Sequence, residues 1–493
     1  MQIQSVSINF TGGIISPGYL KEILEAAQIA KVQDVRFGLR QQLVLEVPKP
    51  FFEEFERDCK GRGIMTYDQK KALPNILSSY PAAGIFTTES WVREGVFKDI
   101  FDSLQFLPKL KVNICDRQQS FVPFFTGHIN WVSSSSQHFW HLYLRFPKTS
   151  RLYQWKDLVY TNDIPVVTKA IEEEILSQID LYHEKGTADW NQLFRKIKAA
   201  IPYIAKESEG EGFSAFSLPY YEGFNKINNQ LWLGIYRRNE HFALNFLMEV
   251  CTLCLKTRVG QLYSTPWKSI IVKNIEADHR KHWDLLLGKY RINVRHAANE
   301  LNWQVEDLHE DSLMLKRHII RYFDKEDVRT YGLCFAVQTR PGTNLFGSVL
   351  IMKQANKNPH NLRALDRYSI LYKKDFDPNA EGLLLFRKDV EKEHLGIYLV
   401  SLCKQFYERQ EEEIRLLEES VIVEEYAVDQ LMSYHQCPAC HTIYIPEMGD
   451  EAQQVRPGTS FESLPECYSC PLCEMPKAGF VEVKGAIPGA EVV

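Results

Sequence analysis

Two short cysteine motifs near the end of this 493-residue sequence constrain its folding more than any other feature. Cys437 and Cys440 frame the motif CPAC, and Cys470 and Cys473 frame the motif CPLC further along the chain. A CxxC turn can place both thiolates on one side of a tight loop, and the proline at its second position stiffens that loop. Two such turns facing each other form a tetrahedral cage of sulfurs, which suits iron or zinc. The spacing therefore predicts a metal centre, although four cysteines could also belong to a small core.

A fifth cysteine, Cys467, precedes Cys470 by three residues, so this segment offers two overlapping CxxC pairs. Only Cys470 and Cys473 bracket a proline as the first motif does, and we therefore expect Cys467 to be a spare thiol. The chain has 11 cysteines, an odd number, whereas a secreted disulfide framework would spread pairs through a short chain. Metal ligation is thus the favoured interpretation of the clustered cysteines.

A further set of positions between residues 437 and 480 forms a specific pattern. These positions are Tyr444, Pro446, Gly449, Asp450, Pro457, Gly458, Thr459, Phe461, Leu464, Pro465, Pro471 and Lys477. With the four cysteines, they make the segment resemble the rubredoxins over nearly the whole length of that family. The resemblance implies one iron ion bound by Cys437, Cys440, Cys470 and Cys473, which cycles between Fe3+ and Fe2+ and carries one electron. Zinc in the same site remains an alternative.

A module of about 50 residues buries little surface, so the metal is expected to help hold it together. We expect its small core to consist of the aromatic residues Tyr444, Phe461, Tyr468 and Phe480. The segment departs from the family where glycine usually follows each motif, because His441 and Glu474 occupy those positions. A Cβ atom there could crowd the cage or impose an unfavourable φ.

The beginning of the chain has a different pattern. Ser16-Pro17 is a good helix start, and an apolar stripe follows it at helical spacing (Leu20, Ile23, Leu24, Ala27). Residues 35–47 then alternate as in one strand, interrupted only at Gln41. The opposite face of that strand would carry Arg36, Gly38 and Arg40, a plausible floor for a flat anionic ligand. The alternative is a solvated strand face with a glycine bulge.

A second copy of this helix and strand follows at residues 242–275, and Gly38 of the first copy aligns with Thr265 of the second. The motifs Ile15-Ser16-Pro17-Gly18 and Arg40-Gln41, together with Thr265-Pro266-Trp267-Lys268 in the second copy, resemble the nitrite and sulfite reductases. Those enzymes contain two ferredoxin-like half-domains. The resemblance covers roughly residues 1–400 and implies an α+β fold: a duplicated reductase-like scaffold followed by the small metal-stabilised domain.

The resemblance and the composition together give expected domain boundaries. They are 1–80 for the first ferredoxin-like half-domain, 81–225 for the first mixed α+β domain, 226–300 for the second half-domain, 301–403 for the second reductase-like segment, 404–433 for an acidic helix or linker, and 434–485 for the rubredoxin-like domain. The acidic helix is expected to be a solvated spacer with an apolar stripe at Ile414, Leu417 and Val421.

The cofactor chemistry of the reductases is not expected here. Sirohaem reductases ligate a [4Fe–4S] cluster through cysteines spaced C-x5-C and C-x3-C, and the six cysteines before CPAC contain neither spacing. Sirohaem and the cluster are therefore expected to be absent. A tetrapyrrole could still bind, and the candidate cofactor-binding residues are Arg36, Arg40, Arg117 and Lys268. Cys251, Cys254, His128, His138 and His141 are interpreted as structural.

Charge and hydropathy exclude some broad classes. The formal net charge of −5 gives no electrostatic reason to expect nucleic acid as a partner. The N-terminus, MQIQSVSINF, alternates like a strand and lacks the features of a secretory signal. No apolar run approaches the ~20 residues that span a membrane, so we expect a cytoplasmic protein.

The sequence therefore predicts an electron-transfer protein: a rubredoxin-type iron centre fused to a catalytically degenerate scaffold that docks a partner or a tetrapyrrole. Its expected partner is a redox protein, and nitrite or sulfite assimilation is a candidate setting by analogy of fold alone. Two alternatives stay open: an active sirohaem-type oxidoreductase with atypical ligation, and a non-redox binding protein with structural zinc. Whether the chain is itself an enzyme is left undecided, with an electron carrier favoured.

Overall fold

The computed structural model describes residues 2–69, 71–87, 91–122, 126–146, 152–182, 189–208, 216–340, 345–355, 365–429 and 433–484. The contacts divide the chain into two compact units, which we call unit 1 (residues 1–403) and unit 2 (residues 404–493). Across the described ranges, no helix is both long enough and apolar enough to cross a membrane.

Unit 1 contains a pair of five-stranded sheets that exchange strands. Their strands are β1 (Ile3–Ile8), β2 (Ile14–Ile15), β3 (Asp34–Phe37), β4 (Leu43–Pro48), β5 (Tyr67–Asp68), β13 (Gly223–Ile227), β14 (Gln230–Ile235), β15 (Phe242–Ala243), β16 (Leu262–Ser264) and β17 (Ile270–Glu276). The strand orders are β15-β3-β4-β1-β5 and β13-β14-β17-β16-β2. Each half-domain thus donates one two-residue strand to the other, because β2 pairs with β16 and β15 pairs with β3.

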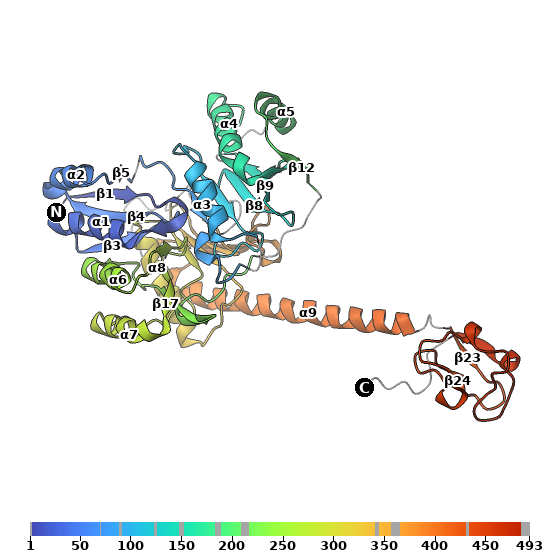
Figure 1. Ribbon diagram of the computed structural model, residues 1–493. Coiled ribbons are helices and arrows are strands. Elements are labelled where there is room, and N and C mark those ends of the chain that lie inside the picture. Colours follow the sequence, from blue (N-terminus) through green and yellow to red (C-terminus); the bar gives the residue numbers. More distant parts are fainter. Residues whose placement is uncertain are drawn as a thin grey trace. The chain divides into compact units, whose positions relative to one another are not determined.

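Four helices accompany these sheets: α1 (Pro17–Ile29), α2 (Phe52–Gly61), α6 (Leu244–Lys256) and α7 (Arg280–Lys289). Helix α1 begins at Pro17 as predicted, although the Ser16 side chain makes no capping hydrogen bond. The predicted stripe of α1 is buried, and α1 packs directly against α6 (Figure 1). Residues from both half-domains therefore share one hydrophobic core.

The duplication is confirmed in the backbone, where matching elements are displaced equally along the chain. Helix α1 starts at Pro17 and α6 at Leu244, and β4 starts at Leu43 and β17 at Ile270. The turns between the paired strands also match. In the first, the Gly38 N–H donates to the Gln42 carbonyl at 2.8 Å, and in the second the Thr265 N–H donates to the Ser269 carbonyl at 3.0 Å.

The prediction of one strand over residues 35–47 is wrong. The chain instead forms a hairpin, in which β3 ends at Phe37 and β4 starts at Leu43. Gln41 closes the turn with a φ of 62°, in the left-handed region, and Lys268 does the same in the second copy with a φ of 57°. The alternation persists in the sequence because both strands bury the same side.

Unit 1 also contains two mixed sheets with the same topology. The first consists of β6 (Leu77–Ser78), β7 (Val112–Cys115), β8 (Ile129–Ser133), β9 (Phe139–Arg145), β10 (Leu152–Gln154), β11 (Asp157–Tyr160) and β12 (Ala205–Glu207). The second consists of β18 (Trp303–Val305), β19 (Phe335–Gln338), β20 (Val349–Lys353), β21 (Tyr368–Tyr372) and β22 (Leu384–Val390). In each, three parallel strands are followed by two antiparallel ones, namely β6-β7-β8-β9-β11 and β18-β19-β20-β21-β22.

The helices repeat with the sheets. Helix α3 (Glu94–Ser103) connects the first two parallel strands of one sheet, and α8 (Glu310–Lys325) connects those of the other. Helix α4 (Ile164–Ser177) follows β11, as α9 (Leu395–Asp429) follows β22, and α5 (Trp190–Ala200) belongs to the first copy.

Helix α9 starts nine residues before the predicted acidic segment at 404–433. Its first turns belong to unit 1, because Leu395, Leu399 and Leu402 are fully buried there. Ile414, from the predicted apolar stripe, is 55% exposed, and the side chains of Leu417 and Val421 lie outside the described residues. The finer domain boundaries within residues 1–403 stay a prediction, since these residues form one compact unit.

Unit 2 is built around a three-stranded sheet of order β24-β23-β25, with β23 (Ser433–Gln436), β24 (Ile443–Tyr444) and β25 (Val481–Lys484). Its core consists of Tyr444, Val455, Phe461, Leu464 and Tyr468, with Phe480 packed against it. Three of the four predicted aromatic residues are therefore confirmed as core residues, and the fourth, Phe480, is partly buried at the edge of the core.

Candidate metal centre

Four sulfurs converge in unit 2. The Sγ atoms of Cys437 and Cys473 lie 3.4 Å apart, as do those of Cys440 and Cys470, and all four lie within 4.8 Å of one another. A tetrahedral site with metal–sulfur bonds of about 2.3 Å requires sulfur–sulfur distances of about 3.8 Å. Among the described residues, these four cysteines form a group of side chains that could hold a metal ion. Cys467 is exposed and outside the group, as predicted.

The two cysteine loops have the same backbone hydrogen bonds. In the first loop, the His441 N–H donates to the Cys437 carbonyl at 2.9 Å, and the Cys437 N–H donates to the Thr442 carbonyl at 2.8 Å. The second loop repeats both bonds, from Glu474 to Cys470 at 2.9 Å and from Cys470 to Met475 at 2.7 Å. Each loop thus aims its two sulfurs to the same side.

The residue after each motif has a left-handed backbone, with a φ of 62° at His441 and 59° at Glu474. These are the positions where the sequence departs from glycine, and the expected unfavourable φ is confirmed. A side chain there costs roughly 1–2 kcal/mol relative to an ordinary backbone region. The cage geometry is kept in spite of this strain.

The acidities of the thiols show how the cage responds to charge. Hydrogen bonds from the side chain and backbone of Thr442 lower the pKa of Cys440 to about 6, and the Thr442 Oγ1 lies 3.0 Å from its sulfur. The Met475 backbone lowers the pKa of Cys473, but the neighbouring sulfurs, Cys437 first, raise it to about 12 overall. The neighbouring sulfurs therefore disfavour a thiolate at Cys473, and a bound cation would offset that repulsion.

The cage is partly open to solvent. Cys437 and Cys470, the first cysteine of each motif, are buried, whereas Cys440 is half-buried and Cys473 is exposed. Leu472, within the second motif, is 76% exposed. Each loop therefore supplies one inner and one outer sulfur.

The predicted basic site does not form as a single face. The Arg36 guanidinium lies 2.6 Å from Glu310 and 3.6 Å from Glu46. The Lys268 ammonium lies 2.7 Å from Glu240 and 3.4 Å from Asp307. The structure brings Arg36 and Lys268 to the walls of the same narrow crevice, together with Glu240 and Asp307.

Arg40 lies elsewhere because it belongs to the turn and not to the strand. Its guanidinium donates to the carbonyls of Asn75 and Val112 and to the Asn113 side chain, at 2.8–3.2 Å. Arg117 lies in the turn after β7, where its backbone N–H donates to Ser133 Oγ. The prediction that Arg36 and Arg40 lie on the same face of one strand is therefore wrong.

Of the cysteines and histidines interpreted as structural, Cys251, Cys254 and His141 are buried, whereas His128 and His138 are half-buried. Cys251 and Cys254 are fully buried in α6 within the shared core, and burial raises the pKa of Cys251 to about 12. Burial, reinforced by Lys111, Arg145 and Arg40, lowers the pKa of His128 to about 3.

Sequence reasoning missed a group of cations around Arg40. Lys111 and Arg145 interact electrostatically with that guanidinium and with the neutral imidazole of His128, and Lys373 interacts with Arg145. These residues come from widely separated segments of the chain, so no local motif connects them.

The cysteine-rich domain is similar to known proteins. A family model described as Rubredoxin matches residues 434–480. Rubredoxin of Synechocystis sp. is 47% identical over 47 residues, which cover 10% of this chain and 41% of that protein. Rubredoxin-2 of Chlorobaculum tepidum is 42% identical over 52 residues, which cover 10% of this chain and 100% of that protein. The chain thus spans less than half of the first relative and the whole of the second.

A solved structure resembles most of the chain. The NirA protein of Mycobacterium tuberculosis matches with a TM-score of 0.59 at 12% identity, covering 80% of this chain and 79% of that chain. At this identity the likeness concerns the fold. It confirms, for the fold, the reductase-like scaffold inferred from the sequence.

Proposed function

Because the chain belongs to the rubredoxin family through residues 434–480, we propose that it is a one-electron carrier whose iron ion is bound by Cys437, Cys440, Cys470 and Cys473. The observation that carries the proposal is the convergence of these four sulfurs within 4.8 Å. Iron bound by four thiolates supplies a ferric–ferrous couple. An S4 donor set suits that ion.

The chain's own residues would position the sulfurs and control their surroundings. The two loops fix the sulfur positions through matched backbone hydrogen bonds. The hydrogen bonds of Thr442 favour the thiolate of Cys440. Tyr444, Phe461 and Tyr468 form the core of the unit, and the sulfurs of Cys437 and Cys470 are buried; such shielding from water would tune the reduction potential.

For unit 1 we propose a catalytically degenerate scaffold that docks a redox partner protein. Its fold resembles NirA, while its sequence lacks the cysteine spacings that ligate a [4Fe–4S] cluster. A setting in nitrite or sulfite assimilation rests on that fold analogy. We place the protein in the cytoplasm, and the absence of a disulfide among its 11 cysteines, all of which the structure describes, is consistent with a reducing compartment.

Tetrapyrrole binding stays a prediction, with Arg36, Arg40, Arg117 and Lys268 as the candidate residues. In the structure, such binding would cost free energy because internal contacts would have to break. Arg36 and Lys268 are already paired with carboxylates, and Arg40 is bound to carbonyls. An external carboxylate would have to displace these internal partners. This favours the electron carrier over a sirohaem enzyme.

A metal count together with a visible spectrum of the purified full chain tests the proposal. We expect one iron per chain and a thiolate-to-iron absorption that bleaches on one-electron reduction and returns in air. Zinc in place of iron, from cells grown with adequate iron, would favour the structural-zinc alternative. Strong tetrapyrrole bands would favour the reductase alternative.

A further inference from the structure

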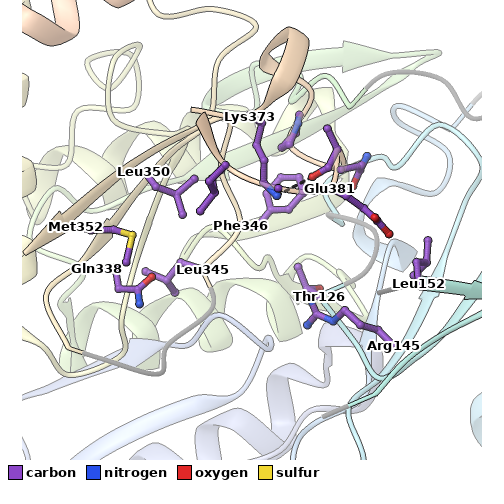
Figure 2. Close-up of a pocket in the computed structure, with 16 residues that line it drawn as sticks. Thr126, Arg145, Leu152, Gln338, Leu345, Phe346, Leu350, Met352, Lys373 and Glu381 are labelled. Atoms are coloured by element: carbon purple, nitrogen blue, oxygen red, sulfur yellow. Dashed lines mark hydrogen bonds between the residues drawn. The ribbon is translucent and has the colours of Figure 1, made fainter. Parts of the chain in front are cut away.

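Unit 1 contains a cavity of about 430 Å³ whose walls come from both mixed sheets (Figure 2). This volume lies within the range of roughly 300–1,000 Å³ that is typical of small-molecule sites. Leu345, Phe346, Leu350 and Met352 form an apolar wall, and Arg145 and Lys373 contribute the cationic groups. Figure 2 shows Leu350 and Met352 at the left of the view, Arg145 and Thr126 at the lower right, and Lys373 above them at the top.

Arg145, the last residue of β9, and Lys373 are the two cations of the lining, which also includes Glu381. Within the described ranges, the Arg145 guanidinium has no hydrogen bond and no carboxylate at ion-pair distance, and burial lowers its pKa. The other arginine of this cluster, Arg40, is bound to backbone carbonyls instead. Arg145 therefore has a complete set of donors to offer a ligand.

The cations nearby strengthen the positive potential. Burial, reinforced by Arg40 and Arg145, lowers the pKa of Lys111 to about 8. Burial also lowers the pKa of Lys373, and Arg145 lowers it further, whereas Asp377 and Glu381 raise it. Lys373 donates to the Ala380 carbonyl at 2.6 Å, which holds its ammonium beside the cavity. An anion placed here would relieve the repulsion within the cluster.

We propose that this cavity binds an organic carboxylate with a compact apolar body. Arg145 offers the planar fork of donors that matches a carboxylate, and Lys373 adds a second positive charge. The apolar wall of Leu345, Phe346, Leu350 and Met352 receives the body and disfavours a small inorganic anion. The site lies wholly in unit 1, so it is independent of the proposed iron function.

Calorimetric titration of the iron-loaded full chain with 2-naphthoate and its neutral counterpart, 2-naphthamide, tests the proposal. We expect naphthoate to bind at least roughly tenfold more tightly than naphthamide, because only the carboxylate forms a charge-assisted bond. Arg145→Gln should weaken naphthoate binding about tenfold and leave naphthamide binding unchanged. Arg195→Gln, at a guanidinium that is 74% exposed on α5, is the matched control and should change neither.

Equal affinities for the two probes, or no binding of either, would overturn the proposal, as would naphthoate affinity that survives Arg145→Gln. Tryptophan fluorescence melting verifies that each variant is folded. If Arg145→Gln unfolds, the test passes to Lys373→Gln and to the salt dependence of the wild type. Naphthoate binding should then weaken with Lys373→Gln and with added potassium chloride, and constancy in both would reject the site.

Discussion

Both units of this protein are built from two copies of a motif, but the copies are joined differently. In unit 1 the copies of the helix and hairpin are joined by apolar packing and exchanged strands. In unit 2 the CPxC loop that begins at Cys437 recurs at Cys470, and its copies are joined by a shared sulfur cage. The cage needs all four ligands, so its loops keep the same hydrogen bonds. Apolar packing does not require the two hairpin turns of unit 1 to have the same side chains or the same hydrogen bonds.

The two turns of unit 1 show the resulting divergence. Gln41 and Lys268 occupy equivalent buried positions with positive φ. The Gln41 amide donates to the carbonyls of Ser78 and Ser264, both at 3.0 Å, whereas Lys268 forms ion pairs with Glu240 and Asp307. One backbone thus supports a neutral network in the first copy and an ionic network in the second.

The comparison predicts that the metal ligands contribute to the folding stability of unit 2 and not to that of unit 1. Cys470→Ser should abolish iron binding and unfold unit 2, since structural metal sites contribute on the order of 10 kcal/mol to folding. All nine tryptophans lie within residues 1–403, so tryptophan fluorescence reports on unit 1 and visible absorption on unit 2. The fluorescence midpoint in urea should not change.

Two controls accompany this variant. Cys467→Ser should retain iron, because its thiol lies outside the cage. A chain ending at His435 should remain soluble and unfold with the wild-type fluorescence midpoint. An insoluble truncation, or a large shift of the fluorescence midpoint in Cys470→Ser, would show that the units fold as one.

The next largest loss of stability is expected in unit 1, from disturbing the second hairpin turn, which contains Lys268. Glu240→Gln removes the closest charge partner of Lys268, whose side chain is 4% exposed. Breaking a buried pair from one side costs about 3–5 kcal/mol. Urea unfolding followed by tryptophan fluorescence should show this loss, with the iron absorption unchanged.

An exposed ion pair provides the contrast for Glu240→Gln. Lys289 and Glu249 lie 2.6 Å apart but are 60% and 40% exposed, so Lys289→Met should cost about 1 kcal/mol or less. If the two variants lose equal stability, burial of the pair is not what distinguishes the second turn.

A pH prediction follows from Lys316 in α8, which is buried against the Tyr236 hydroxyl at 2.9 Å. Burial lowers its pKa from 10.5 to about 8. Between these two values the unfolded state binds more protons than the folded state, so wild-type stability gains with rising pH. The gain attributable to this residue approaches about 3 kcal/mol across the window.

Lys316→Met lacks this ionisation and should therefore lack the gain. The free energy of unfolding is measured for both proteins by urea titration of tryptophan fluorescence. From about pH 7 to pH 10, the wild type should become more stable relative to the variant. A difference that stays constant with pH would contradict the buried, perturbed ammonium.

The smallest effect is expected from the strained loop of unit 2. His441→Gly relieves a left-handed backbone and should stabilise the iron-loaded unit by about 1 kcal/mol, measured as loss of visible absorption in denaturant. Glu447→Gly, in the same unit but without a positive φ, should give no such gain. Equal gains at both positions would mean that the His441 backbone is not strained.

The parts of the fold that follow local rules could be predicted from sequence. The metal ligands were identifiable because each CPxC motif is a complete local turn, and α1 because its start and apolar stripe agree. The hairpin at residues 34–48 was missed because both strands keep one alternation across the turn. Gln41 was visible as an interruption, but a turn with positive φ at glutamine has no strong sequence signal.

The partners of the basic residues could not be predicted because they come from distant segments. Arg36 pairs with Glu310, 274 positions away, and Lys268 pairs with Asp307, which follows β18. Only the tertiary packing decides which carboxylate reaches which cation. The cavity around Arg145 has the same origin, since its walls come from both copies of the mixed sheet.

The uneven exposure of the cage sulfurs has a kinetic consequence. Electron tunnelling slows exponentially with the distance between donor and acceptor, so the outermost ligand atom sets the shortest route. Here that atom belongs to Cys473, with Cys440 beside solvent as well, while the inner sulfurs are covered. A partner touching this edge would exchange an electron through one cysteine without any opening of the fold, whereas one bound to the aromatic side would face a longer path.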